Sequence, residues 1–412
     1  MRLELSICAL GLLAGCTSHD RTDASRGTVR EISVPAEVGS GEPNLSTAED
    51  AIVLSWLEAA PEGGHDLWMA RLDASGRWEG RRRVVHGDSL FVNWADFPSV
   101  TVGGDGRLWA HWLRRRPGAG LAYDIRLSHS ADAGETWSDA TTPHDDGTPT
   151  EHGFVSVIPE PSGVSLVWLD GRAYAPSVEG GEPAREMSLR ARAISSRSSL
   201  EDEVLLDDRT CDCCQTDAAR TADGLVVVYR NRTEDEVRDI YVTRRTALGW
   251  TPGVPVHRDG WVIAGCPVNG PAVDASGNQV AVAWFTGEGN IPRVFVAFST
   301  DGGVTFADPI RVDGGSPAGR LDLRLRADGT ALVSWLERTG ADGAELRLGR
   351  YGPQGQEGEA IVVSSSSTAR ASGFPRMVAA PWNPDEVLLA WTDVSDPDAS
   401  QVRLVSVETS QR

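Results

Sequence analysis

A strand-like segment recurs seven times along the sequence, and its regular spacing restricts the fold more than any other feature does. Each copy is a run of aliphatic residues that ends in an aromatic residue, and the aromatic positions are Trp56, Trp112, Trp168, Tyr229, Trp284, Trp335 and Trp391. The shortest spacing is 51 residues (Trp284 to Trp335) and the longest is 61 (Trp168 to Tyr229). A period this regular is the signature of a repeat architecture, so we predict one large domain.

Within each repeat the same strand and turn signals follow one another. A first strand, such as 98–102, leads through an Asp-Gly or Gly-Asn turn into the strand with the aromatic residue; an alternating strand, such as 125–128, and a short fourth strand follow. Alternating apolar and polar residues between Gly-rich turns are typical of β-strands. Four antiparallel strands per repeat, arranged radially, make a β-propeller blade. We predict an all-β propeller of seven four-stranded blades, with six blades as the alternative.

The two ends of the repeat region complement each other. The seventh repeat stops after its third strand, residues 402–407, whereas residues 29–34 form a strand that belongs to no repeat. We predict that this N-terminal strand completes the last blade, because closing a ring with both ends of the chain removes exposed sheet edges.

The first residues have the pattern of an export signal. A short apolar run ends in Leu13-Ala14-Gly15-Cys16, which resembles the lipobox of bacterial lipoproteins. The resemblance implies a signal peptide over residues 1–15, a lipidated Cys16 with a tether to residue 27, and a propeller over 28–412. The acyl chains would hold the protein at a membrane outside the cytoplasm, and Thr17 favours the outer membrane. Plain secretion with a free Cys16 thiol is the alternative.

The composition excludes several classes of function. The sequence has 39 Lys and Arg against 59 Asp and Glu, a formal net charge of −20, which argues against nucleic-acid binding because that requires a basic face. All of the positive charge is Arg, since the sequence contains no Lys. This excludes P-loop ATPases, Schiff-base enzymes and Ser–Lys hydrolases.

Two turns carry a more specific motif. Residues 130–137 read S-A-D-A-G-E-T-W and residues 299–306 read S-T-D-G-G-V-T-F. In such a turn the Asp accepts hydrogen bonds from backbone N–H groups, a Gly takes a positive φ, and the aromatic residue packs between sheets. The motif resembles the Asp box, or BNR repeat, of sialidase-type propellers. The resemblance implies a structural role, and no chemistry, for Asp132 and Asp301.

The resemblance also implies where a ligand would bind, namely over the central channel, on the loops that lead into each blade or join its second and third strands. A sialidase site needs three Arg to clamp a substrate carboxylate, a Tyr nucleophile beside a carboxylate, and a carboxylic acid as proton donor. The candidates are Arg172, Arg230, Arg238 and Arg376 for the clamp, Tyr174 with Glu151 or Asp170 for the nucleophile pair, Asp239 or Asp96 for the acid, and Trp94 and Asn269 for other substrate contacts.

Four cysteines cluster on the loops that lead into two neighbouring repeats: Cys211, Cys213, Cys214 and Cys266. Outside the cytoplasm disulfides are the default, and Cys211–Cys214 with Cys213–Cys266 is one of three connectivities. A zinc or copper site aided by His152, or free redox thiols, are the alternatives.

Two functions remain open from the sequence. The first is a sialidase-type glycoside hydrolase that removes terminal acidic sugars. The second is a non-catalytic propeller lipoprotein that binds a glycan or a protein at the same face. The sequence lacks the early Arg-Ile-Pro element of sialidases, so fold resemblance alone does not decide. We expect a monomer without a cofactor.

Overall fold

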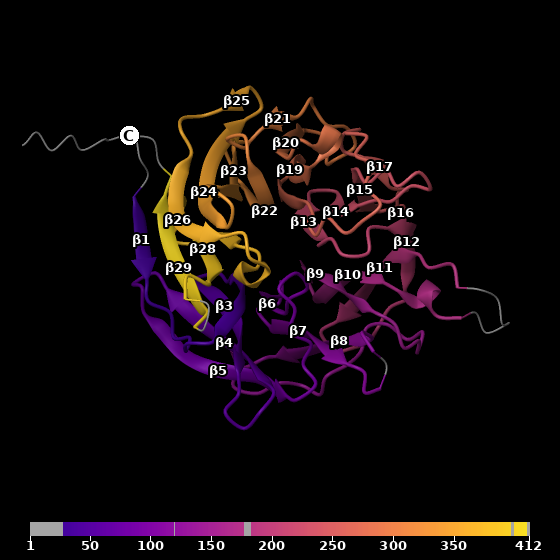
Figure 1. The fold of residues 1–412 in the computed structure, drawn as a ribbon. Coiled ribbons are helices and arrows are strands. Elements are labelled where there is room, and N and C mark those ends of the chain that lie inside the picture. Colours follow the sequence, from indigo (N-terminus) through magenta and orange to yellow (C-terminus); the bar gives the residue numbers. More distant parts are fainter. Residues whose placement is uncertain (1–27, 119, 177–182, 397–398, 410–412) are drawn as a thin grey trace, which may run out of the picture.

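The computed structural model describes residues 28–118, 120–176, 183–396 and 399–409. The signal peptide, Cys16 and the tether predicted from the sequence lie outside these residues. Seven antiparallel sheets are arranged in a ring (Figure 1), which confirms the prediction of a seven-bladed β-propeller and rules out six blades.

Blades one to four follow one another in chain order, each counted from its innermost strand. Blade one contains β2 (Ser40–Thr47), β3 (Ala51–Ala59), β4 (His65–Asp73) and β5 (Trp78–Gly87). Blade two contains β6 (Ser99–Val102), β7 (Leu108–Arg115) and β8 (Tyr123–Ser130), with a single bridge from Leu127 to Thr141 at its outer edge. Blade three contains β9 (His152–Glu160), β10 (Gly163–Asp170), β11 (Met187–Ser195) and β12 (Val204–Thr210). Blade four contains β13 (Asp217–Thr221), β14 (Gly224–Arg230), β15 (Ile240–Thr246), β16 (Gly249–Trp250) and β17 (Val254–Pro255).

Blades five to seven complete the ring. Blade five contains β18 (Ala272–Ser276), β19 (Gln279–Thr286), β20 (Arg293–Ser299) and β21 (Ile310–Arg311). Blade six contains β22 (Pro317–Leu325), β23 (Ala331–Arg338), β24 (Gly343–Gly352), β25 (Gly355–Gln356) and β26 (Ile361–Ser367). Blade seven contains β27 (Arg376–Ala380), β28 (Asn383–Asp393), β29 (Gln401–Glu408) and β1 (Val29–Ile32). Three short 3-10 helices lie in loops: η1 (Arg172–Tyr174), η2 (Glu288–Asn290) and η3 (Arg370–Ser372).

The N-terminal strand closes the ring as predicted. β1 pairs antiparallel with β29, with Val29 opposite Val407 and Ile32 opposite Leu404. The chain thus begins and ends in the same sheet, and the outer edge of blade seven is covered by a strand from the opposite end of the sequence.

The recurring aromatic residues are the core of the blades. Trp56, Trp168 and Trp284 are fully buried in the second strand of their blades. Three of the Trp indoles donate a hydrogen bond to a carboxylate two residues later: Trp56 to Glu58 (2.6 Å), Trp168 to Asp170 (2.9 Å) and Trp335 to Glu337 (2.7 Å). A buried indole N–H needs a partner, so these acidic residues belong to the core.

Carboxylates on inner strands join neighbouring blades. Asp217 of blade four accepts a hydrogen bond from the backbone N–H of Val273 in blade five (2.8 Å). Asp274 of blade five does the same with Leu325 of blade six (2.9 Å). Asp322 of blade six repeats the contact with Met377 of blade seven (2.8 Å). Each carboxylate accepts a hydrogen bond from a backbone N–H group of the next blade, which has no acceptor within the sheet of that blade.

The two turns with the Asp-box pattern, residues 130–137 and 299–306, are held by their Asp and Ser side chains. Asp132 accepts hydrogen bonds from the N–H and the hydroxyl of Thr136, at 2.9 and 2.6 Å. Asp301 makes the same two contacts with Thr305, at 2.9 and 2.6 Å. Both carboxylates are therefore occupied within their own turns.

Among the described residues the structure holds no helix with the length and apolar character that crossing a membrane requires.

The contacts between blades predict a loss of stability when one is removed. Asp274→Ala leaves the partly buried Leu325 N–H without its acceptor, so we expect the free energy of unfolding to fall by about 1–2 kcal/mol. Urea unfolding followed by Trp fluorescence measures this change. The exposed Asp235 is the control, and equal stability of Asp274→Ala and Asp235→Ala would contradict the prediction.

Candidate functional site

A cavity of about 240 Å³ lies inside the ring, lined by the inner strands of six blades and by the loops that lead into them. Most of its polar lining consists of hydroxyl and amide side chains: Asn44, Ser46, Thr47, Ser99, Thr101, Ser156, Gln215 and Thr216. The charged residues of the lining are Asp96, Asp217, Arg324 and Arg376. Several of these hydroxyl and amide groups already bond within the protein: Ser46 donates to the Val100 carbonyl (2.9 Å), the Ser156 and Thr216 hydroxyls lie 2.8 Å apart, and the Gln215 amide donates to the Ala95 carbonyl (2.7 Å). The cavity wall is therefore polar, with a few charges of both signs.

Arg376 is the one predicted clamp residue that lines this cavity. It begins β27, and its guanidinium lies over the Phe97 ring, 5.7 Å from the centroid. Its Nε is 3.6 Å from an Asp322 carboxylate oxygen, and it is buried without a hydrogen-bond partner. The Asp322 carboxylate also accepts a hydrogen bond from the Met377 N–H (2.8 Å) and lies 3.4 Å from a guanidinium nitrogen of Arg324. Arg376 is thus held in place by Asp322 and Phe97, and 22% of its side chain is exposed.

Burial changes the protonation of two acidic residues in the cavity wall. Burial raises the pKa of Asp96 to about 7, although the Phe154 N–H and the Tyr123 hydroxyl, which donate to it at 2.7 and 2.8 Å, oppose the shift. Burial likewise raises the pKa of Asp217 to about 6, against the opposing charge of Arg376. As the pH falls through this range, the cavity loses negative charge while both Arg residues remain charged.

Tyr174 and Glu151 lie outside the cavity, near the loop that leads into blade four. Tyr174 lies in η1 and is 36% exposed. Burial and then the carboxylate of Asp212, which accepts a hydrogen bond from the phenol, raise the pKa of Tyr174 to about 12. Burial and the charge of Asp212 also raise the pKa of Glu151. The structure therefore gives Tyr174 a carboxylate partner, but that partner is Asp212.

Asp212 lies between Cys211 and Cys213, and no pattern in the sequence distinguishes it as the partner of Tyr174. The predicted partner Asp170 has another role. It is fully buried, accepts the Trp168 indole N–H, and binds Arg172 through two contacts of 2.7 Å. Arg172 also contacts Glu203 at 2.9 Å. Asp170 and Arg172 are therefore an internal ion pair.

Two more of the predicted clamp residues point into the protein. Arg230 is 1% exposed, and its guanidinium donates to the backbone carbonyls of Asn269 (2.8 and 3.1 Å), Arg238 (2.6 Å) and Phe285 (2.7 Å). Arg238 is also buried, and it contacts Glu236 (2.8 Å) and the Cys211 sulfur (3.4 Å). A substrate carboxylate would have to displace these partners, so the structure does not bring three of the four candidate Arg side chains together as a clamp.

The remaining candidates hold loops in place. Asp239 accepts hydrogen bonds from the N–H groups of Gly260 and Trp261, both at 3.2 Å. Asn269 is buried and accepts the Arg320 N–H at 2.8 Å. Trp94 stacks on Phe374, with ring centroids 5.8 Å apart, and Arg320 lies 4.8 Å from the Trp94 centroid. None of these three side chains lines the cavity, and each is engaged in contacts within the protein.

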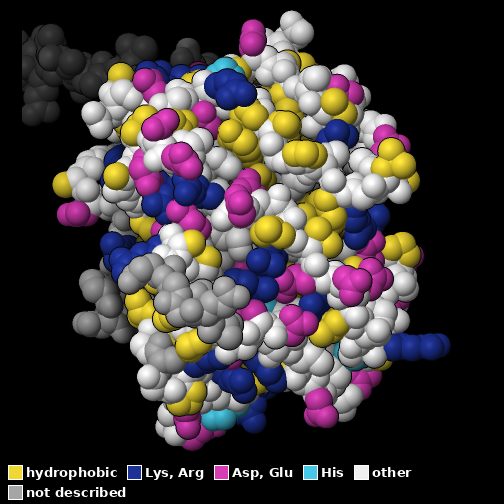
Figure 2. All heavy atoms as spheres, turned by 90° about the vertical axis from the view of Figure 1, so that its right-hand side faces the viewer, with side chains coloured by type: hydrophobic (Ala, Val, Ile, Leu, Met, Phe, Trp, Pro, Cys, Tyr) yellow, Lys and Arg dark blue, Asp and Glu magenta, His cyan; other side chains and the backbone are white. Residues whose placement is uncertain are grey.

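Pairing of charges extends over the surface. On the side of the ring that carries β12, β16 and β17, Arg and acidic side chains lie next to one another rather than in separate patches (Figure 2). Arg232, for example, lies 2.7 Å from Glu236, 3.5 Å from Asp212 and 3.6 Å from Glu186.

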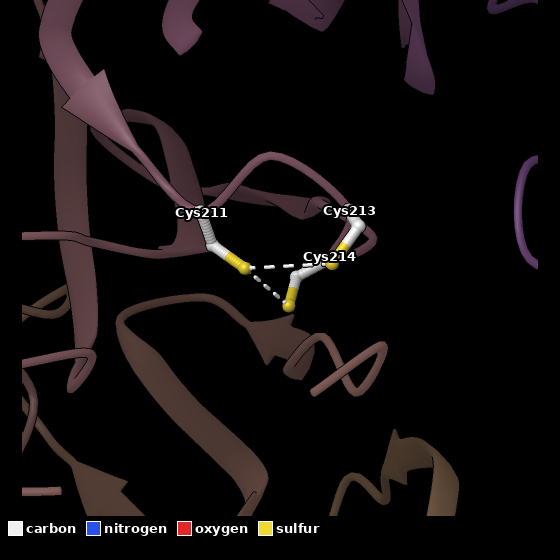
Figure 3. Close-up of side chains that lie close together, drawn as sticks. All are labelled: Cys211, Cys213 and Cys214. Carbon is white, nitrogen blue, oxygen red and sulfur yellow. Dashed lines mark hydrogen bonds between the residues drawn. The ribbon is translucent and has the colours of Figure 1, made fainter. Parts of the chain in front are cut away.

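The four cysteines are brought together, as the sequence predicted. Cys213 and Cys266 form a disulfide that links the loops leading into blades four and five. The second predicted bond, Cys211–Cys214, is not formed: both residues are buried thiols, and their sulfurs make a hydrogen-bonded contact of 2.8 Å (Figure 3).

A second group of potential metal ligands lies in the core between blades two and three. The rings of His144 and His152 stack 3.8 Å apart, and Asp146 lies 3.1 Å from His152 and 3.3 Å from His144. Asp170 lies 3.7 Å from His152. Arg172 already binds Asp170 and lies 3.7 Å from Asp146, so a guanidinium supplies the positive charge that a metal ion would bring.

The raised pKa of Asp96 predicts a pH-dependent stability. A carboxyl group whose pKa is raised from 3.8 to about 7 on folding stabilises the fold at low pH, and this contribution is lost as the pH rises through 7. In Asp96→Asn the group no longer titrates. We expect the loss of stability between pH 5.5 and 8 to be smaller than in the wild type by on the order of 1–2 kcal/mol. Urea unfolding at both pH values measures it. Asp235→Asn is the control, and an unchanged pH dependence in Asp96→Asn would refute the prediction.

No protein-family model matches the sequence, and no curated protein matches it. Several solved structures are similar in fold. The BP39L lectin from Burkholderia pseudomallei is 13% identical with a TM-score of 0.56, covering 90% of this chain and 97% of the lectin. The polysaccharide lyase Uly1 is 7% identical with a TM-score of 0.55, covering 94% of this chain and 100% of the lyase.

A phage phi92 endosialidase is 9% identical with a TM-score of 0.52, covering 94% of this chain and 70% of the enzyme. Binding proteins and enzymes thus share this architecture, and fold alone does not separate them. From its ring of blades, the chain is a seven-bladed β-propeller, and its fold is similar to that of these lectin and endosialidase structures.

Proposed function

We propose that this chain is a carbohydrate-binding propeller that holds the terminal, acidic residue of a glycan in its central cavity without cleaving it. The observation that carries the proposal is the cavity wall, in which hydroxyl and amide side chains surround Arg376, a charged side chain that is 22% exposed.

The size and the chemistry of the cavity favour a single sugar residue. A volume of about 240 Å³ is below the roughly 300–1,000 Å³ that is typical of drug-sized pockets. Hydroxyl and amide groups both donate and accept hydrogen bonds, which matches the hydroxyl groups of a sugar. Arg376 adds a charge-assisted contact for a carboxylate, and Phe97 supports its guanidinium from one side.

The same geometry supports binding more than cleavage. Of the four Arg residues considered for a carboxylate clamp, Arg172, Arg230 and Arg238 bind internal partners. Only Arg376 lines the cavity among them. One Arg can orient an acidic sugar, but a three-Arg clamp of the sialidase type is not formed.

The cellular setting of this proposal comes from the sequence. The lipobox-like segment that ends at Cys16 supports export and a lipid anchor at the outer membrane. The net charge of −20 supports partners other than nucleic acids. A propeller anchored at a membrane through Cys16 would present its channel to glycans outside the cytoplasm.

The binding proposal predicts the effect of neutralising Arg376. We expect the full chain to bind the methyl glycoside of a sialic acid, and Arg376→Gln to weaken binding by at least about tenfold, which corresponds to about 1.4 kcal/mol. Isothermal titration calorimetry measures both proteins, with methyl galactoside as the neutral ligand. The exposed Arg370 provides the control Arg370→Gln. Equal affinity of the Arg376 and Arg370 variants would reject the proposed site.

One observation favours hydrolysis as a second candidate function. Tyr174 is 36% exposed and hydrogen-bonded to Asp212, and the charge of Asp212 also acts on Glu151. With a pKa of about 12, the phenol is neutral at pH 7, so it could attack an anomeric carbon only if Asp212 accepted its proton. Glu151, whose pKa burial raises, could then protonate the leaving group.

This second candidate predicts turnover that depends on Tyr174. If it is correct, the full chain releases the fluorophore from a 4-methylumbelliferyl sialoside, and Tyr174→Phe lowers kcat by at least about 100-fold because the nucleophile is lost. The control is Tyr241→Phe, in strand β15. Wild-type protein that binds sialosides but releases no fluorophore would exclude hydrolysis and leave the binding proposal intact.

A further inference from the structure

The four described cysteines place a disulfide next to a pair of thiols. The Cys211 sulfur lies 2.8 Å from the Cys214 sulfur and 4.0 Å from the Cys213 sulfur, and Figure 3 shows the three side chains converging. Cys213 is bonded to Cys266, whereas Cys211 and Cys214 are free. Cys211 therefore contacts both its thiol neighbour and one atom of the disulfide.

The disulfide and the thiols differ in their access to solvent. Cys211 and Cys214 are 1% and 2% exposed. Cys213 is partly buried, and Cys266 is exposed. A reagent in solution can therefore reach the Cys266 end of the disulfide, while the two thiols are shielded behind it.

The surroundings of Cys211 favour its thiolate. The Arg238 guanidinium donates a hydrogen bond to the Cys211 sulfur at 3.4 Å. Burial alone would raise the pKa of Cys211, but the hydrogen bond from the Cys214 thiol and the charges of Arg230 and Arg238 lower it to about 6. Burial and the nearby Cys211 raise the pKa of Cys214 well above its usual value. Since a thiolate is the nucleophile in thiol chemistry, Cys211 is the attacking group.

We propose that this cluster is a thiol–disulfide exchange site, in which one disulfide moves between an outer position, Cys213–Cys266, and an inner position, Cys211–Cys214. It goes beyond the proposed sugar binding and does not depend on it. In the first step a bond forms between the sulfurs of Cys211 and Cys213 while the Cys213–Cys266 bond breaks, and Cys266 leaves as a thiolate that takes a proton from water.

In the second step Cys214 loses its proton to water, and its sulfur bonds to Cys211 while the Cys211–Cys213 bond breaks. Cys213 leaves as a thiolate and is protonated. The protein holds one disulfide and two thiols before and after, so no external oxidant or reductant is needed. The result is that the link between the loops of blades four and five is released and Cys266 becomes a surface thiol.

Peptide mapping distinguishes the two positions of the disulfide. Trypsin is expected to place Cys211, Cys213 and Cys214 together in residues 210–220 and Cys266 alone in residues 259–293. The outer disulfide links these two peptides, whereas the inner one lies within 210–220 and leaves 259–293 with a free thiol. We would incubate the folded full chain with N-ethylmaleimide without oxygen or reductant, quench with acid and follow the label on Cys266.

We expect Cys266 to be labelled in the wild type at a rate that rises as the pH passes about 6, where the Cys211 thiolate forms. Cys211→Ser lacks the attacking sulfur and should slow this labelling at least about tenfold. Cys214→Ser is the matched variant: it retains the first step, so Cys266 should still be labelled while Cys211 and Cys213 are found joined.

Three outcomes would overturn the proposal. Labelling of Cys266 at the same rate in Cys211→Ser and the wild type would show that Cys211 is not the nucleophile. Two complete disulfides in the untreated protein would leave no thiol to exchange. A zinc or copper ion bound by four reduced cysteines would also exclude it. Mapping under denaturing conditions checks that the outer disulfide is present in Cys211→Ser, so that a misfolded variant is recognised.

Discussion

Closure of the ring is the constraint on which the rest of the structure depends. No blade covers both of its faces by itself, so each needs two neighbours, and the last blade needs a strand from the beginning of the chain. β1 supplies it by pairing with β29. The central cavity exists only because six inner strands are held around one axis, and the same arrangement brings loops distant in sequence to one channel mouth. A break between β1 and β29 would therefore affect the cavity as well as blade seven.

Ring closure also explains why so many charged residues have structural roles. Inner strands of neighbouring blades diverge from one another and do not form a continuous sheet, so some of their backbone N–H groups need side-chain acceptors. Asp217, Asp274 and Asp322 provide them between blades four and seven. Within the core, Glu58, Asp170 and Glu337 accept hydrogen bonds from buried indoles. In a protein built in this way, a high density of Asp, Glu and Arg near the channel is not by itself a sign of chemistry.

This distinction shows what could be predicted from the sequence. The period of the Trp residues and the unpaired strand at residues 29–34 were sufficient for the blade number and the closure, because both depend on local patterns that recur. The roles of Arg172 and Arg230 were not accessible in this way, since a loop position does not show whether a guanidinium points outward or toward carbonyl groups. One signal was overlooked: Asp170 follows Trp168 by two residues, as Glu58 follows Trp56 and Glu337 follows Trp335. The repetition of this spacing indicates a structural contact.

The cysteine cluster and the cavity share a wall. Gln215 directly follows Cys214 and lines the cavity. Its amide donates to the Ala95 carbonyl at 2.7 Å and accepts the Gly270 N–H at 3.0 Å, so it connects the loops leading into blades two, four and five. Cys213–Cys266 fixes two of these three loops relative to each other. The loop that carries Cys211, Cys213 and Cys214 therefore also supplies Gln215 and Thr216 to the cavity wall.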